Sequence, residues 1–338
     1  MHSFSTAGYN PSIMPTTESS LTSVNSLLGL NLDGERLLIV YGSPSGRVQE
    51  RLSVSIPASK SFPSILEHIT STADRLLMIT QAQRLPLPDC VSVSVTGNYD
   101  SLSGTLESSP DFAEWKSEPL KSQLGLRFNL PVFIEQRPIA GLLAEMLFGS
   151  SDTGGTQMYL SFNPTLRASF CLNGVVYQSP GGNAGDIGRI FTCDTPDPRL
   201  NRPLTLNDYV SLNGLASQAL RSQPSHWDLA TTGSQVLQAA VEGDPYAIEL
   251  VEQAAKMLGE NLAPQIHLLR PRQITIAYPI SLVAANFLPP LRAAVAAATG
   301  LGGLELPQIT VSQFSHRQPE LEGLAPAVSA LRLRSNSR

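Results

Sequence analysis

The sequence predicts an α/β fold built from two lobes. Short apolar runs suited to buried strands alternate with longer segments of helical periodicity, and the order strand, strand, helix, strand over residues 37–96 is typical of α/β proteins. The second half shows the same alternation, and 338 residues exceed what one small core requires. We therefore expect two α/β lobes of similar type with a cleft between them.

Composition narrows the classes of function. Charged residues make up 15% of the chain, below the ~25% of an average soluble domain, and the net charge is −5. With only four lysines, no dense basic face is expected, which argues against direct binding of nucleic acid. We find no run of the ~20 apolar residues that span a bilayer and no leader with a charged and then an apolar part, so we expect a cytoplasmic protein without a membrane partner.

The cysteines and histidines do not have the spacing of a metal site. Cys90, Cys171 and Cys193 form no CxxC pair, and none of the five histidines stands three to five residues from another histidine or a cysteine. This pattern predicts inert thiols, no disulfide and no metal.

Residues 1–26 contain eleven serines and threonines and few apolar side chains. Such a segment buries too little apolar surface to offset the entropy lost on ordering, so it is expected to be a flexible polar tail. The alternative is a recognition peptide.

The first lobe is expected to span residues 27–135. Strands are predicted at Leu37–Tyr41 and Val48–Ser55, joined by a turn, and a helix runs from Phe62 to Leu77. The run VSVSVT at Val91–Thr96 alternates apolar and polar residues and predicts a strand.

A site is expected where the last strand of this lobe meets the next helix. After a helix at Pro119–Leu126, the segment Val132–Glu135 predicts a buried strand, and Pro138 stands in the favoured first turn of a helix that ends near Gly149. The polar junction Glu135-Gln136-Arg137 lies at a position that often carries the site in α/β proteins.

The second lobe is expected to span residues 136–318. Strands at Gln157–Phe162 and Leu166–Leu172 precede a hairpin signal, Asn173-Gly174, and Thr195–Pro203 is expected to be a loop. The remaining expected elements are a mostly helical region at Leu206–Leu269 with a kink at Pro264, strands at Ile274–Tyr278 and Ile309–Phe314, a helix at Pro290–Ala298 and a closing helix, 319–333, that returns towards the first lobe.

From Leu27 to about Leu333 the chain resembles the ROK family of repressors, open reading frames and sugar kinases. SPDFAEWKSEPL resembles the family's substrate loop SPNLPGW, LPVFIEQRPIAGLLAEMLFG its LPVxxENDANAAALAExxFG segment, LSFNPTLRASFCLNGVVY its LTLGTGIGAGLILNGRLY segment, GGNAGDIGRI its NGxAGEIGHM segment, and ITIAYPIS its VVLGGGVS segment. The resemblance implies the two-lobed actin/hexokinase-like (ribonuclease H-like) ATPase fold with a central cleft, and a homodimer.

The resemblance also implies where a ligand binds, and there the chain departs from the family. The family's general base, the aspartate of END, is matched by Arg137, which stays protonated and cannot take a proton from a sugar hydroxyl. We therefore expect no catalytic residue. The candidate ligand-binding residues are those at the matching positions: Asp111, Glu135, Gln136, Arg137, Asp186 and Arg189. Arg189 replaces the histidine that serves the family as a zinc ligand, so zinc is expected to be lost.

The nucleotide-binding motifs depart in the same way. The family's phosphate loops and its adenosine-side GGG rely on glycines that let backbone N–H groups approach an anion. Here NLDGE, NPTLR and AYP replace them, which places side chains and prolines in the path of the phosphates. The degenerate positions are Asn31, Glu35, Asn163, Thr165, Arg167 and Tyr278, and ATP and magnesium are expected to be lost.

Two functions follow from the resemblance. The first is a non-catalytic ROK-like protein, a ligand-sensing or regulatory module. Its cleft holds a small polar or anionic sugar, with Arg137 and Arg189 favouring an anion, or is empty with Arg137 paired to Asp186. The alternative is an ATP-dependent sugar kinase of the glucokinase or N-acetylsugar kinase type with a displaced site. Family repressors carry a helix-turn-helix domain ahead of this part, and 26 residues are too few for one. A role in transcription is therefore expected only through a partner, or if the chain is a truncated product.

Overall fold

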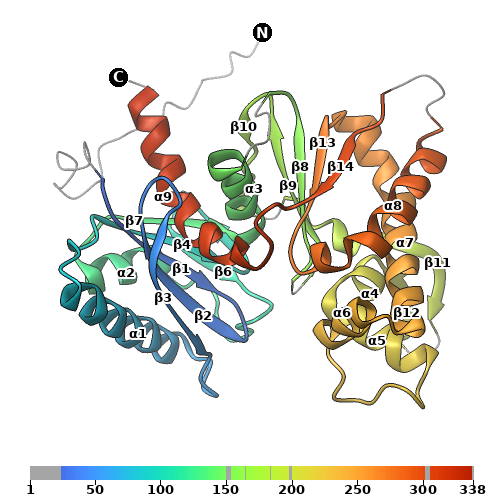
Figure 1. Cartoon of the computed structure of the whole chain (residues 1–338), viewed down its shortest axis with the longest axis horizontal. Helices are drawn as coiled ribbons and strands as arrows, with labels where there is room; N and C mark the ends of the chain where they lie inside the picture. Colours follow the sequence, from blue (N-terminus) through green and yellow to red (C-terminus); the bar gives the residue numbers. More distant parts are fainter. Residues whose placement is uncertain are drawn as a thin grey trace, which may run out of the picture.

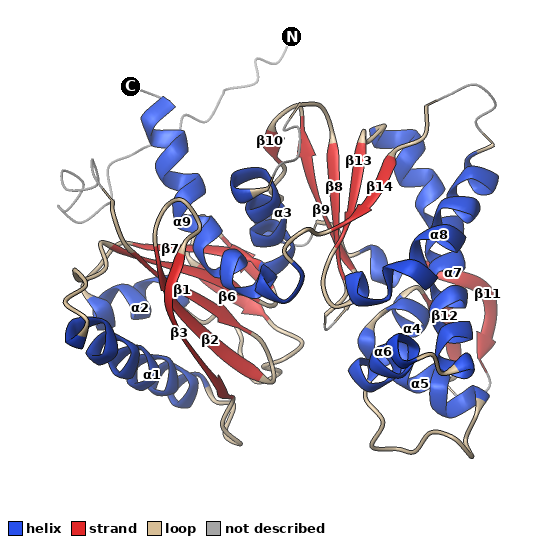
Figure 2. Ribbon diagram, viewed as in Figure 1, coloured by secondary structure: helices blue, strands red, loops and turns tan. Residues whose placement is uncertain are grey.

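The computed structural model describes residues 24–149, 154–163, 165–182, 184–197, 200–300 and 305–336. Most of the expected polar tail, residues 1–23, lies outside the described residues. Two sheets form the centres of two lobes, and helices pack on both (Figures 1 and 2).

The first sheet has the strand order β3-β2-β1-β4-β7. β1 is antiparallel to β2 and parallel to β4, and β4 is parallel to β7. Its strands are β1 (Leu27–Leu32), β2 (Arg36–Gly42), β3 (Val48–Ser55), β4 (Cys90–Val95) and β7 (Val132–Gln136). Helices α1 (Phe62–Ala82) and α2 (Leu120–Phe128) pack near the sheet, and β5 (Asn98–Asp100) pairs with β6 (Thr105–Ser108) in a small hairpin.

Sequence analysis missed β1, which is the central strand of this sheet. All six of its residues are buried. The close packing of β1 against its neighbours requires a glycine at position 29, because a Cβ there would lie 2.8 Å from side-chain atoms of both Leu324 and Val40. A strand buried on both faces is apolar without a clear alternation, so its periodicity gave little signal.

The second sheet repeats the arrangement, with the strand order β10-β9-β8-β13-β14. β8 is antiparallel to β9 and parallel to β13, as β1 is to β2 and β4. Its strands are β8 (Gln157–Ser161), β9 (Arg167–Leu172), β10 (Val175–Val176), β13 (Gln273–Ile276) and β14 (Gln308–Val311). Asn173 and Gly174, at φ 51° and 84°, form the hairpin turn that the sequence indicated.

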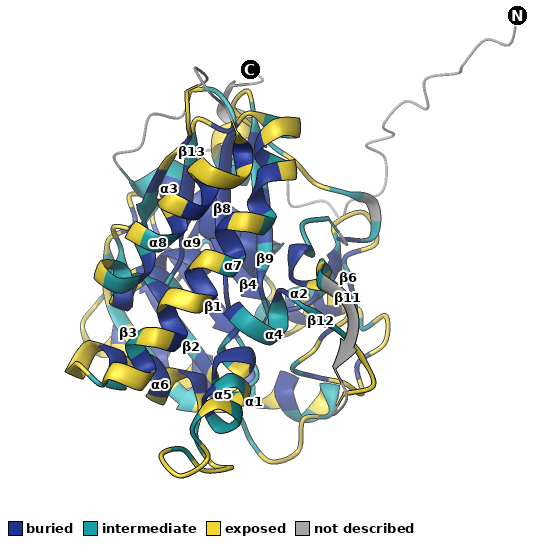
Figure 3. Ribbon diagram, turned by 90° about the vertical axis from the view of Figure 1, so that its right-hand side faces the viewer, coloured by how far each residue is buried: buried dark blue, intermediate teal, exposed yellow. Residues whose placement is uncertain are grey.

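The helices of the second lobe are α4 (Asn207–Val210), α5 (Leu212–Ser222), α6 (Gly233–Glu242), α7 (Pro245–Leu269) and α8 (Ala284–Thr299). α7 packs against the other four, and α8 also contacts β14 of the sheet. α7 continues through Pro264, and it turns buried side chains inward and exposed ones outward (Figure 3). α8 begins at Ala284, ahead of the expected start at Pro290, and its close packing on α7 relies on Gly259, where a Cβ would lie 2.6 Å from that of Ala294.

The expectation of a loop at Thr195–Pro203 was wrong in part. β11 (Phe191–Asp197) and β12 (Arg202–Thr205) form a two-stranded antiparallel hairpin in which Asp197 faces Arg202. The prolines are tolerated because both strands of a two-stranded sheet are edge strands.

Two helices join the lobes. α3 (Arg137–Phe148) follows β7 of the first sheet but packs on β8 and β9 of the second. α9 (Gln318–Asn336) follows β14 of the second sheet but packs on β1, β2 and β4 of the first. α3 and α9 also pack against each other between the two sheets (Figure 1).

One helical stretch, residues 280–299, is long and apolar enough to cross a membrane by length and composition alone. This corrects the expectation that no run reaches that length. Its side chains Phe287, Leu291 and Val295 are buried in the core of the second lobe together with Leu258 and Leu262 of α7. We therefore describe it as a core helix.

Candidate functional site

The candidate site lies where strands of both sheets end, around the first turn of α3. Asp33 follows β1, Thr96 follows β4 and Asn163 follows β8, while Arg137 begins α3 directly after β7. The carboxyl ends of neighbouring strands meet at one edge of a sheet, which is where open α/β folds bind ligands. Pro138, next to Arg137, has a fixed φ that suits the first turn of a helix, and so it favours the start of α3 at this point.

Arg137 is a buried cation with two carboxylate partners. Its Nε lies 3.2 Å from Glu322 Oε2, its Nη1 lies 3.4 Å from Asp33 Oδ2, and its side chain is only 10% exposed. Burial by itself lowers the pKa of Arg137, but Glu322 and Asp33 outweigh that effect and raise it. The guanidinium therefore stays charged and accepts no proton.

Glu322 collects further hydrogen bonds from elements of both lobes. It accepts from Asn31 Nδ2 at 2.9 Å, from Gln318 Nε2 at 2.7 Å and from the Tyr159 hydroxyl at 3.3 Å. Gln318 Nε2 also contacts that hydroxyl. We call Asn31, Asp33, Arg137, Tyr159, Gln318 and Glu322 the hinge network, because they connect β1, β8, α3 and α9.

Asp111 is a second buried carboxylate close to Arg137. Its Oδ1 lies so near Gly34 that a Cβ there would approach to 2.7 Å. Burial raises the pKa of Asp111, and the charge of Asp33 adds to this, whereas Arg137 opposes it. Asp111 Oδ2 and Thr96 Oγ1 are both buried, and the interaction of the Thr96 hydroxyl with Asp111 lowers the pKa of that carboxyl.

Glu135 and Gln136 contact the segment that follows β10. Glu135 Oε1 accepts a hydrogen bond of 2.7 Å from Gln178 Nε2, and burial raises the pKa of Glu135 to about 7. Gln136 Nε2 donates to the Tyr99 carbonyl at 3.4 Å and lies against Gly182, where a Cβ would come within 2.5 Å of it.

Asp186 and Arg189 lie apart from the hinge network. Asp186 Oδ2 pairs with Arg189 Nε at 3.2 Å, and the Arg189 side chain is 83% exposed. The pair of Arg137 with Asp186, one of the two interpretations of the sequence, was therefore wrong, because each has a different partner.

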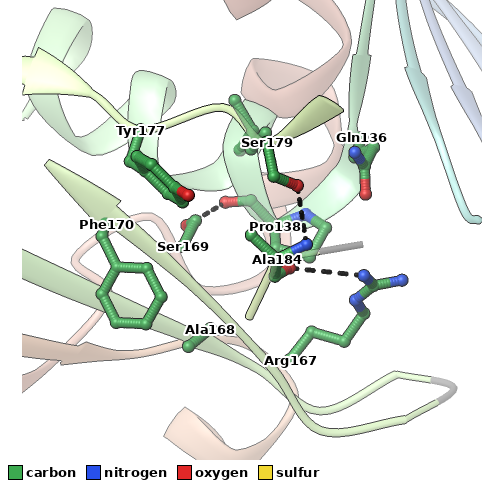
Figure 4. Close-up of a pocket in the computed structure, with 10 residues that line it drawn as sticks. Gln136, Pro138, Arg167, Ala168, Ser169, Phe170, Tyr177, Ser179 and Ala184 are labelled. Carbon is green, nitrogen blue, oxygen red and sulfur yellow. Dashed lines mark hydrogen bonds between the residues drawn. The ribbon is translucent and has the colours of Figure 1, made fainter. Parts of the chain in front are cut away.

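Arg167, at the start of β9, occupies the space between the lobes. Its Nη1 donates to Asn98 Oδ1 at 2.9 Å, and its Nη2 donates to the carbonyls of Gly182 and Ala184 at 3.3 and 3.4 Å. Figure 4 shows the bond to Ala184. Cavities of about 10 and 20 Å³ are both lined by Arg167 and Pro138. Each has room for about one water molecule, so a sugar ring does not fit in this conformation.

The positions matched to nucleotide binding are distributed around the same region. Asn31 belongs to the hinge network, and the Tyr278 amide donates to Gln318 Oε1 at 2.9 Å. Asn163 and Thr165 line the 20 Å³ cavity with Arg137 and Arg167, whereas Glu35 is exposed to solvent.

Sequence reasoning missed Asp33, Asn98, Tyr159, Gln318 and Glu322. The signal for Glu322 was faint: it is a carboxylate beside Leu321 and Leu324 in a predicted helix whose neighbouring residues are apolar. Tyr159 is fully buried on β8, and its ring lies against Gly141, where a Cβ would come within 2.4 Å.

Within the described ranges, no three His, Cys, Asp or Glu side chains form a group that could hold a metal ion. Cys90 and Cys171 are buried free thiols, and burial raises the pKa of Cys90 to about 12. The Cys193 side chain lies outside the described part of the chain.

Comparison with known proteins identifies one family and several relatives of the chain. The model of the ROK family matches residues 45–319. The xylose repressor of Caldicellulosiruptor bescii is 23% identical over 317 residues, which cover 90% of this chain and 79% of the repressor.

Solved structures show the same fold. The crystal structure of a ROK family transcriptional regulator, a homolog of the E. coli MLC protein, superposes with a TM-score of 0.79 at 22% identity, covering 90% of this chain and 78% of the regulator. A ROK family glucokinase from Streptomyces griseus, in complex with glucose and AMPPNP, gives a TM-score of 0.75 at 19% identity, covering 90% of this chain and 99% of the kinase. The expected α/β actin/hexokinase-like fold is confirmed.

Proposed function

The chain belongs to the ROK family, and from this premise we propose that it is a non-catalytic member: a sugar-sensing or regulatory module that binds a small sugar without phosphorylating it. We infer that its catalytic and ATP sites are degenerate. We expect no ATP, magnesium or zinc as a cofactor.

The observation that carries this proposal is the state of Arg137. It stands where the resemblance places the family's general base, and it holds a permanent positive charge between Asp33 and Glu322. A guanidinium cannot take the proton of a sugar hydroxyl, and a general base must do so for phosphoryl transfer.

The charges around the cleft favour a neutral sugar over an anionic one. The cleft residues include five acidic side chains, those of Asp33, Asp111, Glu135, Asp186 and Glu322, and three arginines, Arg137, Arg167 and Arg189. Arg137 already has two of these carboxylates as partners and Arg189 has one. To pair with an added anion, these two arginines would have to give up their carboxylates, whereas the hydroxyls of a neutral sugar can donate to the carboxylates without displacing them.

Titration calorimetry tests the proposal. We expect D-xylose, D-glucose or N-acetyl-D-glucosamine to release or absorb heat on binding, D-glucuronate to bind more weakly than D-glucose, and ATP with magnesium to leave the melting temperature unchanged. The absence of heat with every sugar would contradict the sensing function, and stabilisation by ATP would contradict the loss of the nucleotide site.

A second candidate, a sugar kinase with a displaced site, is favoured by Asp111. Its partly buried carboxylate has a buried Oδ2 and a raised pKa, which are properties of a proton acceptor. If the protein is a kinase of the glucokinase or N-acetylsugar kinase type, a coupled assay will show sugar-dependent ADP release that Asp111→Asn abolishes. We expect no turnover in either form.

The relatives also suggest a role in regulation. We propose a cytoplasmic homodimer that contacts nucleic acid only through a partner, since the net charge of −5 gives no basic surface for it. Light scattering would measure the oligomeric state. A gel shift with direct, sequence-selective DNA binding would contradict the indirect role.

A further inference from the structure

Arg167 and Arg137 line the same cavity, but their side chains have different kinds of partner. Arg137 has two carboxylate partners, whereas in the described chain the Arg167 guanidinium donates hydrogen bonds to neutral oxygens: Asn98 Oδ1 and the carbonyls of Gly182 and Ala184. Burial lowers the pKa of Arg167; the charge of Asp186 opposes this shift, and that of Arg189 adds to it. Neutral acceptors hold a cation less strongly than a buried ion pair does, so the Arg167 side chain is the more easily withdrawn of the two.

The three acceptors come from both sides of the cleft. Asn98 belongs to β5 in the first lobe, whereas Gly182 and Ala184 belong to the loop that follows β10 in the second. This loop is pressed against the first lobe, because a Cβ on Gly182 would lie 2.5 Å from the Tyr99 carbonyl. Arg167 therefore closes the cleft by joining its two walls.

The two cavities beside Arg167 share part of their lining. The smaller one is lined by Gln136, Ser169 and Ser179, and the larger one by Thr96, Asn163 and Thr165. Pro138 and Arg167 line both, so the Arg167 side chain borders each of them, and Figure 4 shows it in the smaller one. The buried hydroxyl of Thr96, a residue of the larger cavity, interacts with Asp111.

We propose that Arg167 is a displaceable plug that occupies the ligand subsite. When it withdraws, Asn98 Oδ1 and the carbonyls of Gly182 and Ala184 are left as acceptors, and the two cavities become continuous. The group that suits such a subsite is rich in hydrogen-bond donors and neutral or cationic, as the hydroxyls of a sugar are. Arg167 then sets ligand affinity, because binding includes the cost of expelling it. The identity of the ligand as a sugar rests on the proposed function.

The variant Arg167→Ala tests the plug, because it removes the guanidinium and leaves the other residues of the site in place. Calorimetric titration with D-xylose, D-glucose and N-acetyl-D-glucosamine is expected to show at least about tenfold tighter binding than the wild type, since the competing guanidinium is gone. Methylguanidinium, which restores the lost group as a free molecule, is expected to bind Arg167→Ala and to compete there with the sugar, and to have no effect on the wild type. Arg75→Ala, which removes an exposed arginine of α1, controls for the change in net charge.

A second variant covers the case in which Arg167→Ala does not fold. Arg167→Gln keeps a polar side chain at this position but removes the charge and shortens the reach to Asn98, Gly182 and Ala184, and it is expected to shift sugar affinity in the same direction by a smaller factor. Equal sugar affinity in the wild type and in both variants would overturn the plug and leave the sensing function intact.

Failure of the sensing function gives a different result. If no sugar binds to any form but methylguanidinium binds only to Arg167→Ala, the subsite stands and its assignment to a sugar is overturned. If neither a sugar nor methylguanidinium binds to Arg167→Ala, the plug is overturned.

Discussion

The hinge network and the Arg167 plug each contain a central arginine, but the two arginines are bound by different kinds of partner. In the hinge network, Arg137 joins β1 and α9 through two carboxylates and is almost fully buried. At the plug, Arg167 joins β5 to the carbonyls of Gly182 and Ala184 through neutral oxygens and borders two small cavities. We therefore expect the junction of the lobes to be held more firmly than the mouth of the cleft.

On the function proposed above, this difference explains how the protein can bind a sugar without catalysing its phosphorylation. Replacing the general base by an arginine requires carboxylate partners, because an unpaired buried charge is costly. Asp33 and Glu322 supply them, and in doing so they bind the two lobes together at the hinge. Arg167, by contrast, is bound in the described chain by neutral oxygens and not by carboxylates.

The largest expected effect is on the hinge. Arg137→Met leaves Glu322 and Asp33 without their cation, and breaking a buried ion pair from one side costs about 3–5 kcal/mol of unfolding free energy. Urea unfolding followed by circular dichroism measures it. Arg51→Met is the matched control, since Arg51 is 64% exposed in its ion pair with Glu320, and we expect a loss below about 1 kcal/mol. Equal losses for the two variants would refute the special role of Arg137.

The second largest loss of stability is expected from a packing change at the hinge. Gly141 of α3 lies against Tyr159 of the network, with only 2.4 Å from a Cβ position to the ring. Gly141→Ala therefore overpacks the site and is expected to cost about 1–3 kcal/mol. In α2, a Cβ on Gly125 would meet only Val132, at 3.9 Å, so Gly125→Ala is expected to be neutral or slightly stabilising by reducing the freedom of the unfolded chain. Stabilisation by both substitutions would show that the hinge is loosely packed.

The hinge should also respond to pH through Glu145 of α3. Its side chain is buried with Oε1 unpartnered, and burial raises its pKa to about 7. The folded state therefore binds this proton more tightly than the unfolded state, whose glutamates titrate near ~4.3. Stability from this group is fully present below about pH 4 and is lost as the pH rises towards 7.

Glu145→Gln tests that sign. We expect it to be more stable than the wild type at pH 8, by up to about 3 kcal/mol, and to differ little at pH 4. Thermal melts at the two pH values measure the difference, with Glu252→Gln, an exposed position of α7, as the control. A benefit that is the same at both pH values would contradict the raised pKa.

The smallest effect on stability is expected at the plug. Asn98→Ala removes one acceptor of Arg167 and should lower the unfolding free energy by only about 1 kcal/mol. Asn261→Ala, which removes an amide from α7 that bonds the Met257 carbonyl, serves as the control for stability. A loss as large as that of Arg137→Met would erase the contrast between the two arginines.

Local signals in the sequence were enough for much of the fold. The alternation at Val91–Thr96 and the Asn173-Gly174 turn correspond to β4 and to the hairpin that follows β9. β1 was missed because it is buried on both faces and contains Gly29 and Asn31, residues that weaken a strand pattern. The β11–β12 hairpin was missed because proline was taken as a signal of a loop.

The candidate site was less accessible to sequence reasoning. The family motifs located Arg137, Asp111 and Arg167, but not their partners. Glu322 is 185 residues from Arg137 along the chain and 291 from Asn31, and no local pattern connects residues so distant. Only the packing of α9 across the first sheet brings them together, and this follows from the topology of the whole chain.

The claim that this ROK protein binds sugar without phosphorylating it is tested most directly by phosphorus NMR. The protein is incubated overnight with ATP, magnesium and each of D-xylose, D-glucose and N-acetyl-D-glucosamine. We predict that ATP remains intact and that no sugar-phosphate resonance appears. A sugar phosphate that forms with the wild type and is lost with Asp111→Asn would contradict the account and identify a kinase with a displaced base.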